Sequence, residues 1–246
     1  KKASKRTVII ANHLSYIDPP LIGTYIPDDM KFAINMTVAK EWWVRPFLKI
    51  VKTYPIESNN PIAIKSLIEE VKKNRKIAIF PEGRTSLTGS LMKIYEGPGM
   101  IADKADASIL PIRVDGTQFT CFSKIKKLMS GKFTFRRKIT ITVLPPVKVN
   151  VPAELDSRER RKYIGHALYN VMSEMMFETS SYKETLFHSL INASKLYGRN
   201  TKILQDIDNN IESYQGLLLK SFILANIILK DNRHSSNVGI MLPNMT

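Results

Sequence analysis

Short apolar runs, many of them β-branched, recur through the first 150 residues and alternate with segments of helical pattern. The runs TVIIA (7–11), KIAIF (76–80) and ILPIRV (109–114) are typical of strands buried on both faces. Further strands are predicted at 31–36, 53–56 and 138–143, and helices at 19–26, 41–52, 61–73, 97–104 and 156–176. Because strands that alternate with helices form a largely parallel sheet, the sequence predicts an α/β fold with helices flanking a mostly parallel sheet.

The pattern changes near residue 180. Residues 183–197 and 213–229 are predicted to be helical, and a strand is predicted to begin at 238–242. A chain of 246 residues is long enough for one domain and part of another. We therefore expect a first domain over residues 1–180, followed by a helical C-terminal segment over 181–246 that starts a second domain without completing it.

Composition excludes several kinds of site. Cys121 is the only cysteine, so neither an intramolecular disulfide nor a cysteine-based zinc site can form. The four histidines do not gather with other ligands into a metal-binding pattern, and no metal site is predicted. No run of about 18 apolar residues and no signal peptide is visible, so the sequence predicts no transmembrane helix.

His13 and Asp18 lie in the loop after the first predicted strand, where open α/β folds place ligands and catalytic groups. The two side chains can meet if the loop bends into the first turn of a helix. The carboxylate would fix the tautomer of the imidazole, whose other nitrogen could take a proton from a hydroxyl. Asp18 before Pro19 and Pro20 is also a helix-start signal, so a simple N-cap remains an alternative. Ser15 lacks the context of a nucleophile elbow and is not predicted to be a nucleophile.

A second polar motif, FPEGRTS (80–86), follows the buried strand KIAIF. Gly83 permits an unusual backbone conformation or the close approach of a ligand. Arg84 could hold a phosphate through two parallel hydrogen bonds, and Glu82 could brace the loop by accepting from backbone N–H groups. Taken by itself, the motif is more typical of an ordinary strand-to-loop turn with a solvated arginine.

The two motifs together, HxxxxD (13–18) and FPEGR (80–84), followed by ILPIR (109–113), resemble the glycerol-phosphate and lysophospholipid acyltransferase family. The resemblance covers residues 7–149 and implies the glycerol-3-phosphate acyltransferase fold and an O-acyltransferase of phospholipid metabolism. It implies that His13 deprotonates the acceptor hydroxyl and that Asp18 orients and polarises His13.

The same resemblance assigns the remaining site residues. The acceptor-binding loop would consist of Glu82, Gly83, Arg84 and Thr85, with Arg84 on the phosphate, and Pro111 would shape the acyl-donor side. The resemblance implies no covalent acyl-enzyme, no metal and no cofactor. The co-substrate would be an acyl thioester of acyl carrier protein or of coenzyme A.

One block departs from the family pattern. Members that act on small glycerol phosphates usually carry an arginine at the end of the block between the two motifs, and here that block reads TYPIESN (53–59). A lysophospholipid with a headgroup is therefore favoured over a bare phosphomonoester as the acceptor.

Several runs are moreover similar to bifunctional bacterial enzymes that join a 2-acylglycerophosphoethanolamine acyltransferase to an acyl-carrier-protein synthetase. These runs are PIAIK (61–65), FPEGRTSLTGSLMKIYEGPG (80–99) and GIMLPN (239–244). By this resemblance, residues from about 184 onward would open an adenylate-forming domain. Its phosphate-binding loop and catalytic lysine are not in the chain, so no ATP binding is predicted.

The charge balance points to an anionic partner, because Lys and Arg total 37 against 22 Asp and Glu, a formal net charge of +15. Residues 119–150 contain no acid and carry eight cations, with four phenylalanines among them (Lys124, Lys126, Lys127, Lys132, Arg136, Arg137, Lys138 and Lys148; Phe119, Phe122, Phe133 and Phe135). This span suits an anionic membrane surface or an acidic acyl carrier protein, and both readings stay open. No nucleic-acid-binding motif accompanies it, so no nucleic-acid partner is predicted.

We therefore expect the chain to transfer a fatty acyl group from a thioester to the free hydroxyl of a lysophospholipid, with 2-acylglycerophosphoethanolamine as the first choice. A lysophosphatidate (1-acylglycerol-3-phosphate) acyltransferase is the first alternative. A non-catalytic module that binds a membrane or acyl carrier protein is the second. The expected location is the cytoplasmic face of the inner membrane, with the protein bound peripherally or anchored through parts outside this chain.

Overall fold

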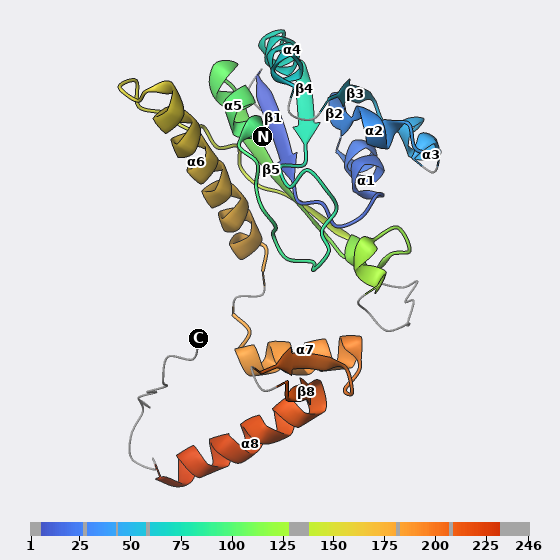
Figure 1. Ribbon diagram of the computed structural model, residues 1–246, viewed down its shortest axis with the longest axis vertical. Helices are drawn as coiled ribbons and strands as arrows, with labels where there is room; N and C mark the ends of the chain where they lie inside the picture. The colour runs from blue at the N-terminus through green and yellow to red at the C-terminus, as the bar shows by residue number, and fades with distance from the viewer. Residues whose placement is uncertain are drawn as a thin grey trace. The chain divides into compact units, whose positions relative to one another are not determined.

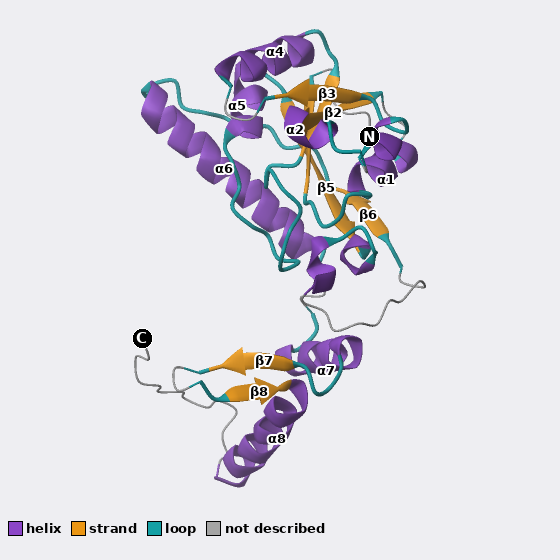
Figure 2. Cartoon of the chain, turned by 45° about the vertical axis from the view of Figure 1, so that its right-hand side comes forward, coloured by secondary structure: helices purple, strands orange, loops and turns teal. Residues whose placement is uncertain are grey.

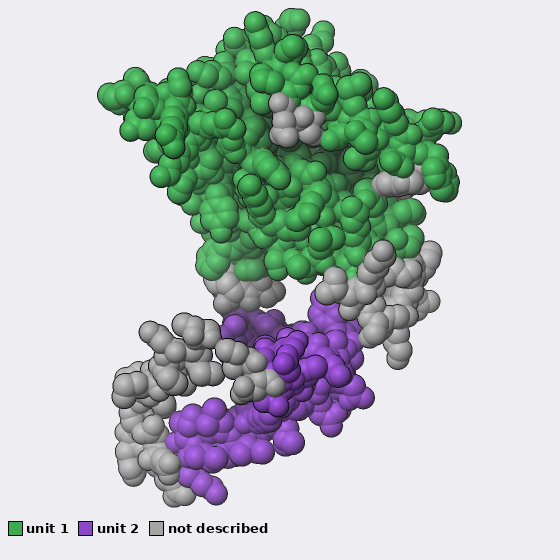
Figure 3. Space-filling model, in the orientation of Figure 1, with its two compact units in different colours: residues 1–181 green, residues 182–246 purple. Residues whose placement is uncertain are grey.

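The computed structural model describes residues 6–26, 29–42, 44–57, 60–127, 138–180, 183–206 and 209–231. The chain divides into two compact units, residues 1–181 and 182–246 (Figure 3).

Unit 1 is built on one sheet, in which six strands of the described residues follow the order β3-β2-β4-β1-β5-β6 (Figure 1). The strands are β1 (Thr7–Ala11), β2 (Met30–Asn35), β3 (Thr53–Ile56), β4 (Lys76–Ile79), β5 (Ser108–Asp115) and β6 (Thr140–Val143). The first five run parallel, and only β6 is antiparallel to its neighbour β5. The predicted fold class, a mostly parallel sheet with flanking helices, is confirmed.

Helices cover both faces of this sheet. The helices described in unit 1 are α1 (Asp18–Tyr25), α2 (Met36–Ala39), α3 (Arg45–Leu48), α4 (Pro61–Lys72), α5 (Gly97–Lys104) and α6 (Ser157–Glu178), with the 3-10 turns η1 (Thr117–Phe119) and η2 (Lys124–Lys127). Successive strand residues point to opposite faces, so β1 contributes Val8 and Ile10 to the core under α4, α5 and α6. Ile9 and Ala11 enter the core under α1 instead. Burial on both faces explains why the strands are continuous apolar runs.

Local signals fix where α6 begins and how it packs. Asp156 caps the helix, and Glu159 bonds back to the Asp156 backbone in a complete capping box. Arg160 then donates two hydrogen bonds, of 3.0 and 2.6 Å, to Asp103 on α5. Gly99 allows the two helices to approach closely, because a Cβ there would lie 2.6 Å from the side chain of Ile164.

The predicted helix over 41–52 is wrong. The described residues of this stretch contain only the four-residue helix α3, and the short helix α2 begins at Met36, where the sequence predicted the end of a strand. Pro46 has no N–H to donate to the carbonyl of residue 42, so a continuous helix cannot pass through it, and it occupies the first turn of α3 instead.

Some sequence predictions fall outside the described residues. They concern Trp43, the strand at 238–242, and residues 128–137 in the middle of the basic span.

The described residues of unit 2 form α7 (Leu186–Tyr197), the antiparallel pair β7 (Lys202–Gln205) and β8 (Ile211–Ser213), and α8 (Tyr214–Asp231) (Figure 2). The two helices agree with the predicted helical C-terminal segment. The two strands were not predicted from the sequence, because they are short and largely polar. That unit 2 opens an adenylate-forming domain remains a prediction. No helix in the described part of the chain is both long and apolar enough to cross a membrane.

Candidate active site

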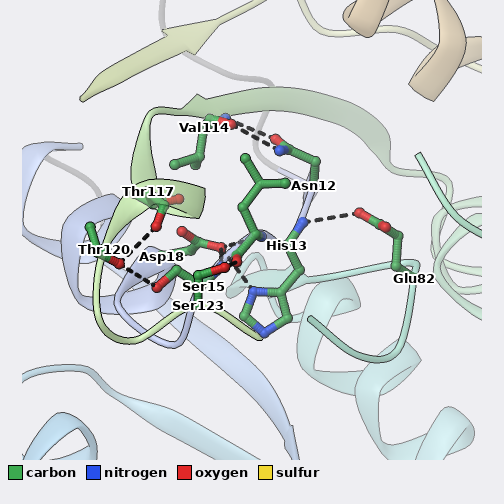
Figure 4. Close-up of polar contacts among 10 residues, drawn as sticks. Asn12, His13, Ser15, Asp18, Glu82, Val114, Thr117, Thr120 and Ser123 are labelled. Carbon is green, nitrogen blue, oxygen red and sulfur yellow. Dashed lines mark hydrogen bonds and ion pairs between the residues drawn. The ribbon is translucent and has the colours of Figure 1, made fainter. Parts of the chain in front are cut away.

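His13 and Asp18 meet at the carboxyl end of β1, where the chain turns into α1 (Figure 4). Asp18 is fully buried, and its Oδ2 accepts three hydrogen bonds: from His13 Nδ1 at 2.9 Å, Leu14 N–H at 2.7 Å and Ser15 N–H at 2.8 Å. Because an ionised carboxylate can only accept, this geometry assigns the imidazole proton to Nδ1. The lone pair of His13 is then on Nε2, the nitrogen that points away from Asp18.

Phe80 supports the imidazole from one side. The two rings stack with their centroids 4.1 Å apart and an interplanar angle of 22°. The His13 side chain is 14% exposed, so the ring is held against the protein while still reaching the surface. Stacking and the Asp18 bond together leave the ring one orientation.

Polar side chains fasten the loop around His13 to β5 and to the turns that follow it. The amide of Asn12 both accepts from Val114 N–H and donates to Val114 C=O, each at 2.8 Å, and so extends the β1–β5 pairing past the end of β1. Ser15 Oγ lies 3.1 Å from Thr120 Oγ1, and Ser123 Oγ donates to Leu14 C=O at 2.8 Å. This anchoring role of Ser15 was not predicted from the sequence, where the residue was considered only as a nucleophile and rejected. Thr120 and Ser123 gave no signal, because their partners are more than 100 residues away in the sequence.

Glu82, after β4, ties the second motif to the first. Its Oε1 accepts from His13 N–H at 3.0 Å and its Oε2 from Met92 N–H at 3.2 Å. In return, Ser86 N–H donates to His13 C=O at 2.6 Å. Burial raises the pKa of Glu82, and the two backbone N–H groups only partly oppose that rise. The structure therefore shows Glu82 as a brace between the two loops.

Gly83 and Arg84 face outward from the same loop. Gly83 has φ +67°, a conformation that disfavours any side chain, and a Cβ there would meet the Tyr95 ring at 3.3 Å. Arg84 is exposed beside it. By contrast Thr85 is 2% exposed, and among the described residues its hydroxyl finds no hydrogen-bond partner. Its predicted contact with substrate remains a prediction.

Pro111 lies inside β5, opposite Ile10 of β1, and is buried. Its carbonyl accepts a hydrogen bond from Leu144 N–H at 3.0 Å. Beside β5, the antiparallel segment after β6 has one extra residue between the pairs Ile112–Val143 and Ile109–Val147. A proline has no N–H to offer there, and such an extra residue is the pattern of a β-bulge. Pro111 is thus part of the sheet and not of the loops that hold His13. Its predicted role on the acyl-donor side remains a prediction.

Within the described residues, no three His, Cys, Asp or Glu side chains gather closely enough to hold a metal ion. His166 and His188 are exposed on α6 and α7, away from the two motifs in the sequence. His13 is the histidine around which the site is built.

Comparisons with known proteins agree with one another. Residues 1–115 match the model of a family described as Acyltransferase. The 1-acyl-sn-glycerol-3-phosphate acyltransferase of Bacillus subtilis (strain 168) is 25% identical over 172 residues, which cover 68% of this chain and 80% of that protein. A protein of the same name from Cocos nucifera is 28% identical over 179 residues, and this chain spans 54% of its length.

A solved structure has a similar fold. The crystal structure of the 1-acyl-sn-glycerophosphate acyltransferase from Thermotoga maritima matches with a TM-score of 0.50 and 23% identity, over 71% of this chain and 68% of that one.

Proposed function

We propose that this chain, whose residues 1–115 match the acyltransferase family model, is an O-acyltransferase that transfers a fatty acyl group from a thioester to the free hydroxyl of lysophosphatidate. The mechanism rests on one observation, the 2.9 Å contact of His13 Nδ1 with a buried carboxylate that also accepts two backbone N–H groups. The choice of acceptor is supported by the relatives, which are named 1-acyl-sn-glycerol-3-phosphate acyltransferases. It takes precedence over the acceptor expected from the sequence, 2-acylglycerophosphoethanolamine.

His13 acts as a general base. Its Nε2 takes the proton of the acceptor hydroxyl while the oxygen attacks the thioester carbonyl carbon. The positive charge that develops on the ring faces Asp18, whose carboxylate is fixed in place by the backbone of Leu14 and Ser15. The new C–O bond forms, the C–S bond breaks as the tetrahedral intermediate collapses, and the thiolate takes the proton back from Nε2. No acyl-enzyme forms on the protein.

The loop after β4 binds the acceptor. Arg84 is exposed and can reach a phosphate, and its guanidinium can donate two parallel hydrogen bonds to phosphate oxygens. Glu82 joins the backbone of this loop to the backbone of His13, so a phosphate bound at Arg84 is positioned relative to the base. The proposed reaction requires no cofactor beyond the thioester co-substrate, either acyl-CoA or acyl-ACP.

A second candidate acceptor, 2-acylglycerophosphoethanolamine, is favoured by two features. The block at 53–59 has no arginine, so a second cationic contact to a phosphomonoester is missing there. The similarity of residues 80–99 and 239–244 to bifunctional enzymes points the same way. This candidate shares the base and the donor. It differs in the ethanolamine group beyond the phosphate and in its free hydroxyl, which is at position 1 of the glycerol and not at position 2.

The deciding experiment measures acyl transfer from labelled acyl-CoA and acyl-ACP to both acceptors. Wild type is compared with His13→Ala, and with His166→Ala as a control for removing an exposed imidazole. Since a general base contributes about 10²–10⁴-fold, His13→Ala should lose roughly that factor in kcat, and His166→Ala should not.

Preference for lysophosphatidate would support the first candidate, and preference for 2-acylglycerophosphoethanolamine would select the second. If neither acceptor is acylated from either donor, a non-catalytic binding module becomes the better description.

A further inference from the structure

The connection between β2 and β3 presents an apolar and cationic surface to solvent. We call it the crossover surface and define it by seven exposed residues between 36 and 50 (the apolar Met36, Val38, Trp42 and Ile50, and the cations Lys40, Arg45 and Lys49). Trp42 is 78% exposed and Ile50 61% exposed. An indole left in water to this extent is unusual for a folded domain, because aromatic rings supply much of the area that folding buries.

The fold holds these side chains outward. Successive turns along the segment are closed by backbone hydrogen bonds from Glu41 N–H to Val38 C=O, from Val44 N–H to Glu41 C=O and from Leu48 N–H to Val44 C=O. Val44 is buried by the same turns and anchors the segment to the domain. The crossover surface is therefore part of an ordered segment with regular backbone hydrogen bonds.

Its charges are unbalanced. Glu41 is the only acid in residues 36–50, against three cations. No ion pair to Lys40, Arg45 or Lys49 exists among the described residues, whereas the neighbouring Lys52 is paired with Asp29 at 2.7 Å. Unpaired cations around exposed indole and aliphatic groups suit a surface that offers both anionic headgroups and an apolar layer beneath them.

The surface begins at the edge of the sheet that carries the site. β1 and β2 both run parallel to β4, so their carboxyl ends lie at one edge. His13 comes two residues after β1 ends, and Met36 directly follows β2. An acceptor whose acyl chain stays in a bilayer could then present its polar end to His13 without leaving the lipid.

We propose that the crossover surface docks this domain on an anionic lipid bilayer and so delivers membrane-resident acceptor to His13. The proposal rests on the proposed function for the identity of the acceptor, but the binding itself can be measured separately. An acidic carrier protein would be attracted by the three cations, yet it gives no reason for Trp42 and Ile50 to be held in water. The lipid surface accounts for both features.

The chain provides its own probe. It contains two tryptophans, Trp42 and Trp43, so intrinsic fluorescence reports on this segment alone. Emission should shift to the blue when vesicles of phosphatidylglycerol and phosphatidylcholine are added, and far less with phosphatidylcholine alone. An unchanged spectrum with anionic vesicles would overturn the proposal. So would a shift that appears only with acyl carrier protein.

Matched charge reversals test the location of the surface. The first triple variant carries Lys40→Glu, Arg45→Glu and Lys49→Glu. The control carries Lys104→Glu, Arg158→Glu and Lys162→Glu, exposed positions on α5 and α6, and has the same net charge. Vesicle affinity should fall at least about tenfold in the first and change about threefold or less in the control. Equal losses would mean that general charge alone causes binding, which would contradict the proposal.

Trp42→Ala, which leaves every charge in place, should weaken vesicle binding as well. Unchanged affinity of this variant would also contradict the proposal.

Activity separates this proposal from the proposed function. The first triple variant should lose transfer to long-chain lysophosphatidate in anionic vesicles but keep transfer to a short-chain analogue dissolved in buffer. Loss of both would show damage to the site and contradict the docking role. If wild type acylates neither form yet binds anionic vesicles, the proposed function fails and the docking surface stands.

Discussion

The two loops that form the site are built in opposite ways. The loop after β1 is tied down at almost every residue: Asn12 bonds to β5, the Asp18 carboxylate accepts three hydrogen bonds, and Ser15 bonds to Thr120. The loop after β4 is anchored through Glu82 but then exposes Gly83 and Arg84 to solvent.

The difference agrees with the two roles that we propose for these loops, one in proton transfer and one in acceptor binding. A general base works only with the right tautomer and the right direction, so its loop benefits from rigid hydrogen bonding. The binding role proposed for the second loop requires it to admit and release a charged ligand, which agrees with the exposure of Arg84. We therefore expect mutations in the first loop to lower kcat and mutations at the exposed end of the second loop to raise KM.

Asp18→Asn should have the largest effect. All three hydrogen bonds to Asp18 end on Oδ2, so an asparagine whose carbonyl takes that place can keep the geometry of the loop while removing the charge that stabilises a protonated His13. We expect kcat to fall by about 10²–10⁴-fold with KM nearly unchanged. The measurement is steady-state transfer alongside thermal unfolding.

Asp18→Ala is the companion variant. It also leaves the N–H groups of Leu14 and Ser15 without a hydrogen-bond acceptor and should be clearly less stable than Asp18→Asn. Full activity in Asp18→Asn would mean that Asp18 is only a helix cap.

Arg84→Ala tests the exposed end of the second loop. Loss of a charge-assisted contact to phosphate should raise KM for the acceptor by about 10–100-fold and leave kcat within a few-fold. Because Arg84 is exposed, the free energy of unfolding should change by no more than about 0.5 kcal/mol. Arg84→Lys should fall between wild type and alanine, since a lysine keeps the charge but not the paired donors. A pure kcat defect would contradict the division of tasks between the loops.

Glu82→Gln acts on the brace between them. The carboxylate accepts one N–H with each oxygen, whereas a glutamine side chain has one oxygen and turns its NH₂ toward the other donor. We expect a loss of about 1–3 kcal/mol in the free energy of unfolding, measured by urea titration.

The cost of Glu82→Gln should depend on pH, with a definite sign. Burial raises the pKa of Glu82 above its ordinary 4.5, so the folded protein holds this proton more tightly than the unfolded chain does. Wild type therefore loses stability as pH rises through the interval between the two values, and the glutamine variant lacks this loss. The difference between the proteins should be smaller at about pH 8 than at about pH 4. A difference that grows with pH would mean that the carboxylate, not the acid, is the form stabilised by folding.

Sequence patterns predicted most strands and helices of unit 1 well, because the signals for them were local. Strands buried on both faces must be apolar throughout, and Asp156 with Glu159 marks the start of α6 within four residues. The family motifs likewise pointed to His13, Asp18 and Glu82, which the structure places in contact, while their roles in the reaction remain predictions. The prediction of a helix over 41–52 was wrong because it relied on apolar residues at helical spacing and gave too little weight to Pro46. The hydrogen bonds of Thr120 with Ser15 and of Ser123 with Leu14 were not predicted, because nothing in the sequence shows which distant residues will lie side by side.

Thr85→Val should have the smallest effect, and it distinguishes two roles for a residue between the braced and the exposed parts of the second loop. The motif predicts that Thr85 binds substrate, yet its hydroxyl is buried and has no hydrogen-bond partner among the described residues. Valine matches the shape of threonine and removes the uncompensated hydroxyl, so stability should be unchanged or rise by up to about 1 kcal/mol, with KM and kcat within about twofold of wild type. Thr85→Ser keeps the hydroxyl and loses the methyl group, and it serves as the matched control for packing. If valine raised KM while serine did not, the hydroxyl would contact the acceptor, and the loop would have to open further than its hydrogen bonds to His13 and Met92 suggest.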